Sequence, residues 1–158
     1  MLGELDAHQI DALLHSQGMG RLGCHANGQT YVVPLTYVYD GKYLYGHTGA
    51  GLKVQMMRAN PEVCFEVDHL EDMANWQSVI VWGTYEELQG DEAARAMQRL
   101  MERLGPLVTS ETSQPSHSRS AETAHTGGAH KFHAGMTNGH PVMYRIRITR
   151  KTGRFEQR

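Results

Sequence analysis

The sequence has little cysteine and no long apolar run. Cys24 and Cys64 are its only cysteines, too few for a disulfide framework or a cysteine-based zinc site. No stretch approaches the roughly 20 apolar residues that a membrane-spanning helix needs. The opening residues 1–10 are polar and acidic, unlike a secretory signal. We therefore expect no membrane association and a cytoplasmic location.

An excess of positive charge is missing as well. The 15 Lys and Arg residues are outnumbered by 17 Asp and Glu, which gives a formal net charge of −2. Binding to nucleic acid is therefore not expected, because it requires a basic surface. The 158 residues are 40% hydrophobic, which suffices for one ordinary domain with a real core.

Periodicity indicates short strands interspersed with helices. Asp6 and Gln9 form a capping-box pattern at the start of the first predicted helix. The dipeptides Asn27-Gly28 and Asp40-Gly41 are typical of hairpin turns, and residues 69–75 are expected to form a polar loop. Helical spacing predicts helices over residues 6–18, 49–60 and 91–104. Alternating or β-branched segments predict strands over residues 22–26, 31–39, 43–47, 63–68 and 78–88, and from residue 142 onward.

Residues 109–140 differ from the rest of the chain, because Ser, Thr, Gly and His dominate them. Such a segment buries too little apolar surface to offset its ordering entropy, so we expect a flexible excursion. His130 and His133 have a spacing that suits a metal on a helix face. The segment has poor helix signals, however, so we predict no metal site.

Antiparallel strands with mostly short connections favour a closed barrel, which leaves no exposed sheet edges. The predicted fold is mainly β with α: a six-stranded, antiparallel Greek-key barrel with about three flanking helices. Residues 1–158 are expected to form a single domain that includes the excursion.

The segment from Tyr45 to Lys53, YGHTGAGLK, is a candidate anion cradle. Glycines let backbone N–H groups approach a ligand, and the N-terminus of a helix attracts negative charge. Thr48 offers a hydroxyl group, and His47 and Lys53 add donors and charge, which together suit a phosphate. The alternative is a tight turn whose glycines serve only steric needs, followed by an exposed lysine.

The order of the segments around this turn favours the interpretation as an anion cradle. Two segments of the chain together resemble the pyridoxamine 5′-phosphate oxidase-like flavin-binding superfamily. They are TYVVPLTYVYDGKYLYGHTGAGLKVQMMRANPEVCFEVD and, after it, NWQSVIVWGTYEEL. The closest likeness is to its nitroimidazole-resistance, flavin-nucleotide-binding branch. The shared pattern is a proline-containing strand, a strand ending in His or Thr, a Gly-x-Lys helix start, an NP-x-V-x-F strand and a Trp-x-Ser-Val strand. The final PVMYRIRITRKTGRFE is similar to the C-terminal strand of that family.

This resemblance implies a split β-barrel homodimer with two FMN sites at the subunit interface. Position by position, it implies isoalloxazine contacts from Val32, Val33, Pro34 and Leu35. It implies ribityl and phosphate contacts from His47, Thr48, Leu52 and Lys53, and contacts to the polar edge of the flavin from Ser78, with Trp76 and Gln77 nearby.

One departure from the family concerns the phosphate. Leu52 stands where relatives often have arginine, which leaves Lys53 as the main countercharge. Arg21 or Arg58 could supply a second cation from elsewhere in the chain.

The resulting hypothesis is an FMN-binding oxidoreductase that passes electrons from reduced flavin to a small acceptor such as a nitro-aromatic. His47 is the candidate catalytic residue. The alternatives are a flavin- or heme-binding protein without turnover, heme being the alternative cofactor, and a true pyridoxamine 5′-phosphate oxidase.

Overall fold

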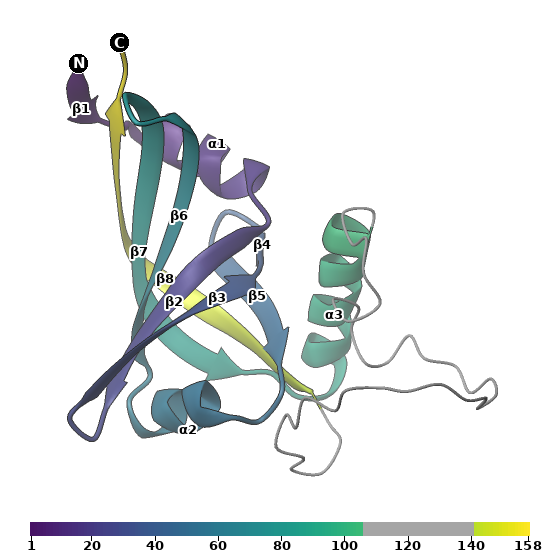
Figure 1. The fold of residues 1–158 in the computed structure, drawn as a ribbon. Helices are drawn as coiled ribbons and strands as arrows, with labels where there is room; N and C mark the ends of the chain where they lie inside the picture. Colours follow the sequence, from purple (N-terminus) through teal and green to yellow (C-terminus); the bar gives the residue numbers. More distant parts are fainter. Residues whose placement is uncertain (106–140) are drawn as a thin grey trace, which may run out of the picture.

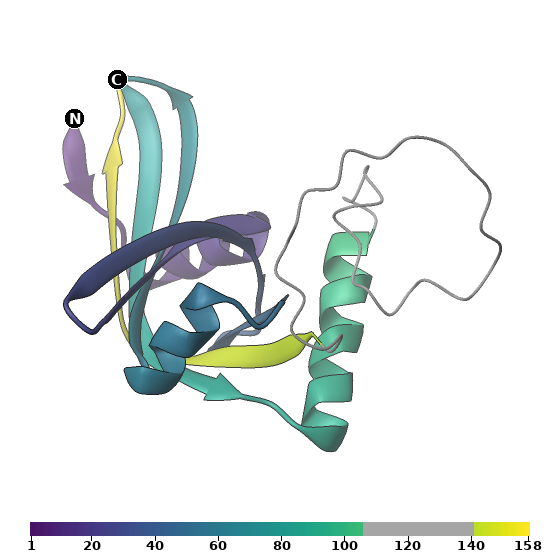
Figure 2. The same ribbon diagram turned by 60° about the horizontal axis from the view of Figure 1, so that its bottom comes forward.

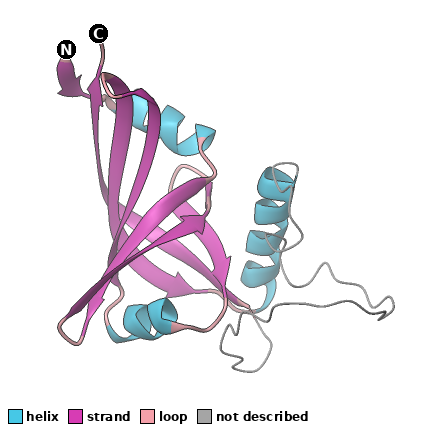
Figure 3. Cartoon of the chain, viewed as in Figure 1, coloured by secondary structure: helices cyan, strands magenta, loops and turns pink. Residues whose placement is uncertain are grey.

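The computed structural model describes residues 1–105 and 141–158, so the predicted excursion over residues 109–140 lies outside the described residues. The described part is a single antiparallel sheet with three helices around it, as Figure 3 shows. The strands are β1 (Leu2–Glu4), β2 (Met19–Ala26), β3 (Gln29–Thr36), β4 (Val38–Tyr39), β5 (Tyr43–Thr48), β6 (Glu62–Asp72), β7 (Asn75–Glu87) and β8 (Val142–Glu156). The helices are α1 (Ala7–Ser16), α2 (Leu52–Ala59) and α3 (Gly90–Leu104).

The strand order is β3-β2-β6-β7-β8-β5-β4, with β1 added beside β8. The strand order therefore begins with β3 and ends with β4, and these two strands are separated in the sequence by Tyr37 alone. The sheet curls on itself, and in Figures 1 and 2 α2 lies at one end of the barrel while both termini lie at the other. The predicted mainly-β barrel with three flanking helices is confirmed.

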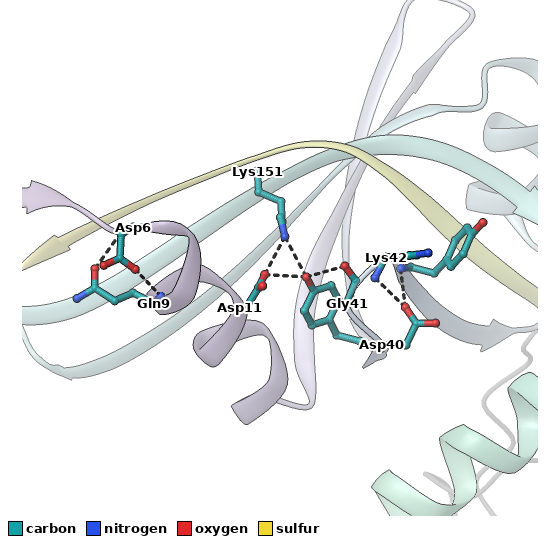
Figure 4. Close-up of polar contacts among 9 residues, drawn as sticks. Asp6, Gln9, Asp11, Asp40, Gly41, Lys42 and Lys151 are labelled. Atoms are coloured by element: carbon teal, nitrogen blue, oxygen red, sulfur yellow. Dashed lines mark hydrogen bonds and ion pairs between the residues drawn. The ribbon is translucent and has the colours of Figure 1, made fainter.

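Local sequence signals explain several boundaries. At the start of α1 the Asp6 carboxylate accepts the Gln9 N–H at 2.8 Å, and the Gln9 side chain accepts the Asp6 N–H at 2.9 Å (Figure 4). This is the predicted capping box. Asn27 and Gly28 have positive φ angles of 53° and 76° between the paired strands β2 and β3, as a tight hairpin turn requires.

The structure corrects the number and length of the strands. The described residues form eight strands rather than six, because β1 is too short to give a periodic pattern and the predicted strand 31–39 is broken. Tyr37 causes the break: its N–H donates to the Gly18 carbonyl at 3.0 Å, and its buried hydroxyl donates to the Leu14 carbonyl at 2.7 Å.

The expected loop over residues 69–75 is wrong. β6 continues to Asp72 and β7 begins at Asn75, with Leu70 paired to Trp76. This hairpin end extends beyond the core, so its polar residues are exposed although they belong to strands. The polar composition of residues 69–75 therefore reflects exposure to solvent and does not indicate a loop.

Two apolar clusters hold the elements together. The larger fills the barrel and includes Leu14, Leu22, Phe65 and Tyr144. The smaller joins α3 to the outside of β5 and β8 through Tyr45, Leu88, Ala96, Leu100 and Met143. None of the helices in residues 1–105 and 141–158 is long and apolar enough to cross a bilayer.

Candidate functional site

The candidate anion cradle forms the connection from β5 to α2. β5 ends at Thr48, a buried residue whose hydroxyl donates to the Gly49 carbonyl at 3.2 Å. α2 then starts with Gly51 at its N-cap, where no side chain supplies a capping hydrogen bond. The N–H groups of the first helical turn therefore lack the side-chain acceptor that commonly satisfies them.

The glycines of this turn are not explained by the conformation of the chain itself. Among the described glycines, only Gly28, Gly41 and Gly90 have positive φ angles. A Cβ atom added at Gly49 or Gly51 would meet no atom within 4 Å. Neither backbone strain nor internal crowding therefore requires glycine at these two positions. The purely steric interpretation of the turn loses its basis, whereas close approach by a ligand remains a reason for small residues.

Lys53 lies in the first turn of α2 and is half-buried. Burial lowers the pKa of its ammonium group, and the nearby Cys24 thiol of β2 raises it by a smaller amount. Within the described residues, no carboxylate lies within ion-pair distance of Lys53. A partly desolvated cation without a carboxylate is suited to an anion from outside the chain.

The proline-containing strand lies close to this cradle. α2 packs against β2, and β2 pairs with β3 so that Gly23 faces Val32 and Arg21 faces Pro34. Val33 and Leu35 pack against the barrel core, whereas Pro34 is exposed and Val32 is 63% exposed on the outer face. The structure therefore brings Lys53 and the outer face of β3 to neighbouring parts of the barrel.

Trp76, Gln77 and Ser78 come from the other end of the barrel. They belong to the start of β7, beside the C-terminal end of β8, whereas α2 lies at the opposite end (Figure 1). The Ser78 hydroxyl donates to a Glu66 oxygen at 2.9 Å, and the Trp76 indole N–H donates to a Glu156 oxygen at 3.2 Å. A single chain thus does not gather all the predicted site residues around one point.

A charged network on the outer face of the sheet connects these two regions. Arg21 contacts Asp68 at 2.8 Å and Glu66 at 3.4 Å, and Glu66 accepts the hydrogen bond from Ser78. Alternation places Glu66 and Asp68 on one face of β6; this spacing is their only signal in the sequence, because neither residue belongs to a recognisable motif.

The same network bears on the phosphate countercharge. The guanidinium of Arg21 already has two carboxylate partners, and that of Arg58 pairs with Glu87, Nη2 to Oε2 at 3.2 Å. Both arginines therefore have acidic partners of their own. Lys53 remains the cation of the cradle.

His47 occupies a different face of β5 from Thr48. Alternation along the strand places His47 on the side of Tyr45, which packs against α3, and Thr48 on the side of Leu44 in the barrel core. His47 is half-buried. Its predicted catalytic role stays a prediction, and its side chain lies on the face of β5 that packs against α3.

Comparison with known proteins identifies the family of the chain. The family model described as pyridoxamine 5′-phosphate oxidase matches residues 6–129. An uncharacterized protein of Rhizobium meliloti (strain 1021) is 39% identical over 84 residues, which cover 53% of this chain. The match spans 56% of the length of that relative.

Solved structures show the same fold. A FAD-binding protein from Mesorhizobium loti superposes with a TM-score of 0.71 at 28% identity, over 100% of this chain and 98% of that protein. A candidate 5-nitroimidazole antibiotic resistance protein from Bacteroides thetaiotaomicron superposes with a TM-score of 0.65 at 16% identity, over 98% of this chain and 87% of that protein. With a family model that matches most of its length and a barrel shared with these structures, the chain belongs to the pyridoxamine 5′-phosphate oxidase family.

Proposed function

We propose that this chain binds FMN, with its phosphate in the Gly49–Lys53 turn, and passes electrons from the reduced flavin to a small acceptor. The observation that carries the proposal is the turn itself. It joins glycines that the backbone does not require to a half-buried lysine that lacks a carboxylate partner among the described residues. Similarity to the Mesorhizobium loti FAD-binding protein, at 28% identity over the whole chain, supports a flavin as the ligand.

The donor set fits one phosphate group. Lys53 supplies the charge and the uncapped start of α2 its backbone N–H groups. The Thr48 hydroxyl donates to the Gly49 carbonyl in the ligand-free chain and would have to turn to donate to the phosphate. A single cradle of this kind favours FMN over FAD, whose pyrophosphate would need a second group of donors. With only one cation, the site is expected to bind the phosphate less tightly than relatives that add an arginine.

The outer face of β3 is proposed to hold the flavin ring. Val32 and Pro34 offer exposed apolar surface there, and Val33 and Leu35 anchor the strand in the core. A bound flavin supplies the electron-pair transfer itself, and the protein orients the ring and shields it from water. We propose that His47 donates a proton to the reduced acceptor; its side chain lies on the α3 side of β5, so this role requires the acceptor, and not the ring on β3, to reach that face. The resemblance to the nitroimidazole-resistance branch supports a nitro-aromatic acceptor.

We further propose that a second copy of the chain completes each site. The outer face of the sheet exposes Val32, Met19 and Leu70, each more than half accessible. Ser78 lies on the same face as Val32, separated from it by β6 and β2. A homodimer formed through this face would cover apolar surface and bring Trp76 and Ser78 of one copy to the ring held by the other, whereas the Gln77 side chain points to the opposite face of β7. Sedimentation equilibrium tests the dimer directly.

The binding test compares three ligands on the purified full chain. FMN, FAD and riboflavin are titrated while flavin fluorescence is followed. We expect FMN to bind more tightly than riboflavin, because only FMN carries the phosphate. Equal affinities would overturn the proposed phosphate cradle. Retention of hemin, with failure to bind any flavin, would instead favour the heme-binding alternative.

Turnover is tested on the FMN-loaded protein. The bound flavin is reduced with dithionite without oxygen, a nitroimidazole is added, and the return of the visible flavin absorption is timed. Re-oxidation faster than that of free reduced FMN supports the oxidoreductase. A flavin that stays reduced after nitroimidazoles and quinones are added would overturn the proposed oxidoreductase activity and favour a flavin-binding protein without turnover.

A further inference from the structure

A cleft lined by several cationic side chains lies on the barrel, on elements other than the Gly49–Lys53 turn. A cleft of about 680 Å³ is bounded by the start of α1, the turn between β4 and β5, and β8 from Arg147 to Lys151. This volume lies in the range of small-molecule sites in proteins. None of the residues proposed to hold the flavin lines it.

The pairing of β8 explains why the cleft exists. β8 pairs with β5 up to Arg147 and with β1 from Arg154 onward. Between these two ladders, the edge of β8 that faces α1 has no strand beside it in the described chain. The register against β7 also shifts here, and the Thr149 hydroxyl donates to the Trp82 carbonyl at 3.1 Å. A bulge at such a gap opens the surface and leaves side chains directed into it.

The charge of the cleft is positive. Its lining contains Lys42, Arg147, Arg150 and Lys151 and no carboxylate. Carboxylates outside the lining compensate two of these cations. The Asp11 Oδ1 atom accepts a hydrogen bond from Lys151 Nζ at 2.7 Å (Figure 4). The Glu86 Oε1 atom lies 3.5 Å from Arg147 Nε.

Lys42 and Arg150 are left without such compensation. Neither forms an ion pair with an acidic residue in the part of the chain that the structure describes. The guanidinium carbon of Arg150 lies 4.3 Å from the centre of the Trp82 ring, an arrangement that orients the group by a cation–π contact. The strand register places Arg150 and Trp82 on the outer face of the sheet, so this contact restrains the guanidinium beside the open edge of β8.

The remaining wall of the cleft is apolar. Its lining also includes Ala7 and Ile10 of α1, Ile148 of β8 and Tyr43 of β5. A ligand that satisfies both parts has negatively charged groups at one end and a flat or apolar body at the other. Inorganic phosphate would leave the apolar wall in water, and a neutral aromatic molecule would leave the cations without a partner.

We propose that this cleft binds a phosphorylated small molecule of nucleotide size, with its phosphates between Lys42 and Arg150. Hydrogen bonds hold one lining residue in place, since Lys151 donates to Asp11 at 2.7 Å and to the Tyr39 hydroxyl at 3.0 Å. The site does not depend on the proposed flavin function, because it uses different residues and elements.

The test is isothermal titration of the full chain with ADP, pyrophosphate and adenosine. The double variant Lys42→Gln/Arg150→Gln removes the two uncompensated cations. Arg95→Gln/Arg158→Gln removes the same charge from exposed positions outside the cleft. Lys53→Met addresses the flavin cradle, to which a nucleotide phosphate could also bind. Thermal unfolding by circular dichroism confirms that each variant folds.

We expect ADP to bind the wild type more tightly than either fragment and to bind less tightly as salt rises. Lys42→Gln/Arg150→Gln should weaken ADP by about tenfold or more, whereas Arg95→Gln/Arg158→Gln and Lys53→Met should retain it. ADP binding that is absent, unchanged in Lys42→Gln/Arg150→Gln, or lost in Lys53→Met would overturn the proposal. Pyrophosphate or adenosine binding as tightly as ADP would overturn the assignment to a nucleotide-sized ligand.

Discussion

Replacing Lys53 by methionine separates its role in ligand binding from its role in folding. Methionine keeps a long, flexible, largely apolar side chain and removes the charge. In the folded protein, burial lowers the pKa of Lys53 below its ordinary value of 10.5, so folding disfavours its charged form. We expect Lys53→Met to leave the ligand-free protein as stable as the wild type or to stabilise it by up to about 1 kcal/mol.

The pH dependence follows from the direction of the shift. Because the folded pKa is lowered, the unfolded chain binds the proton more tightly than the folded one. The destabilisation by Lys53 is therefore full below the folded pKa and fades as pH rises toward 10.5. The stability difference between Lys53→Met and wild type should thus be largest near neutral pH and shrink in alkaline solution.

The effect on FMN should be opposite in sign and larger. A hydrogen bond to a charged group contributes about 1.5–3 kcal/mol, which corresponds to about 10- to 150-fold in affinity. Riboflavin lacks the phosphate, so its affinity should not change. The ratio of FMN to riboflavin affinity in Lys53→Met should therefore fall toward one.

Fluorescence titration measures both affinities, and urea unfolding of the ligand-free protein measures stability. Arg95→Met is the matched control, because Arg95 is an exposed cation on α3 outside the proposed site. Unchanged FMN affinity in Lys53→Met, or an equal loss in Arg95→Met, would refute the reasoning. A large loss of stability in Lys53→Met would show that the lysine is structural.

Two further predictions concern the scaffold. A Cβ atom at Gly46 would lie 2.3 Å from the hydroxyl of the buried Tyr144, so Gly46→Ala should cost about 1–3 kcal/mol in thermal unfolding. Gly51→Ala, where a Cβ meets no atom within 4 Å and only the N-cap preference for glycine over alanine is lost, should cost clearly less; equal stability of the two variants would contradict the packing argument. Asp11 has its pKa lowered from 3.8, chiefly by the hydrogen bond from Lys151, so its stabilising effect is present above pH 3.8 and is lost as pH falls through the folded pKa. Urea unfolding at several pH values should show the difference between wild type and Asp11→Asn shrinking in acid, and a constant difference would contradict this.

Much of the fold could be predicted because the signals are local. Asp6 and Gln9 specify the start of α1 through side-chain to backbone hydrogen bonds three residues apart. Asn27-Gly28 specifies a hairpin because both residues must adopt positive φ. The apolar stripe of α3 and the alternation in β8 likewise depend only on neighbours in sequence.

The errors in the prediction have the opposite cause. Tyr37 interrupts an apparently continuous strand because its N–H and hydroxyl find partners at Gly18 and Leu14, about twenty residues away in the chain. The strand β1 exists because β8 offers it an edge. Neither event leaves a periodic signal, since each depends on a partner that is distant in sequence.

For the candidate site, the sequence alone determined the composition of the cradle. Glycines, a threonine and a lysine follow one another within a few residues, so a strand end and a helix start suffice to assemble them. Tertiary structure decided which charges stay available. Arg21 and Arg58 received carboxylate partners from other strands, and Lys53 received none among the described residues. It also opened the second cationic cleft, because α1, the β4–β5 turn and β8 meet only through long-range packing. Such compensation of charge depends on distances between segments that are far apart in the chain, and only the folded structure fixes those distances.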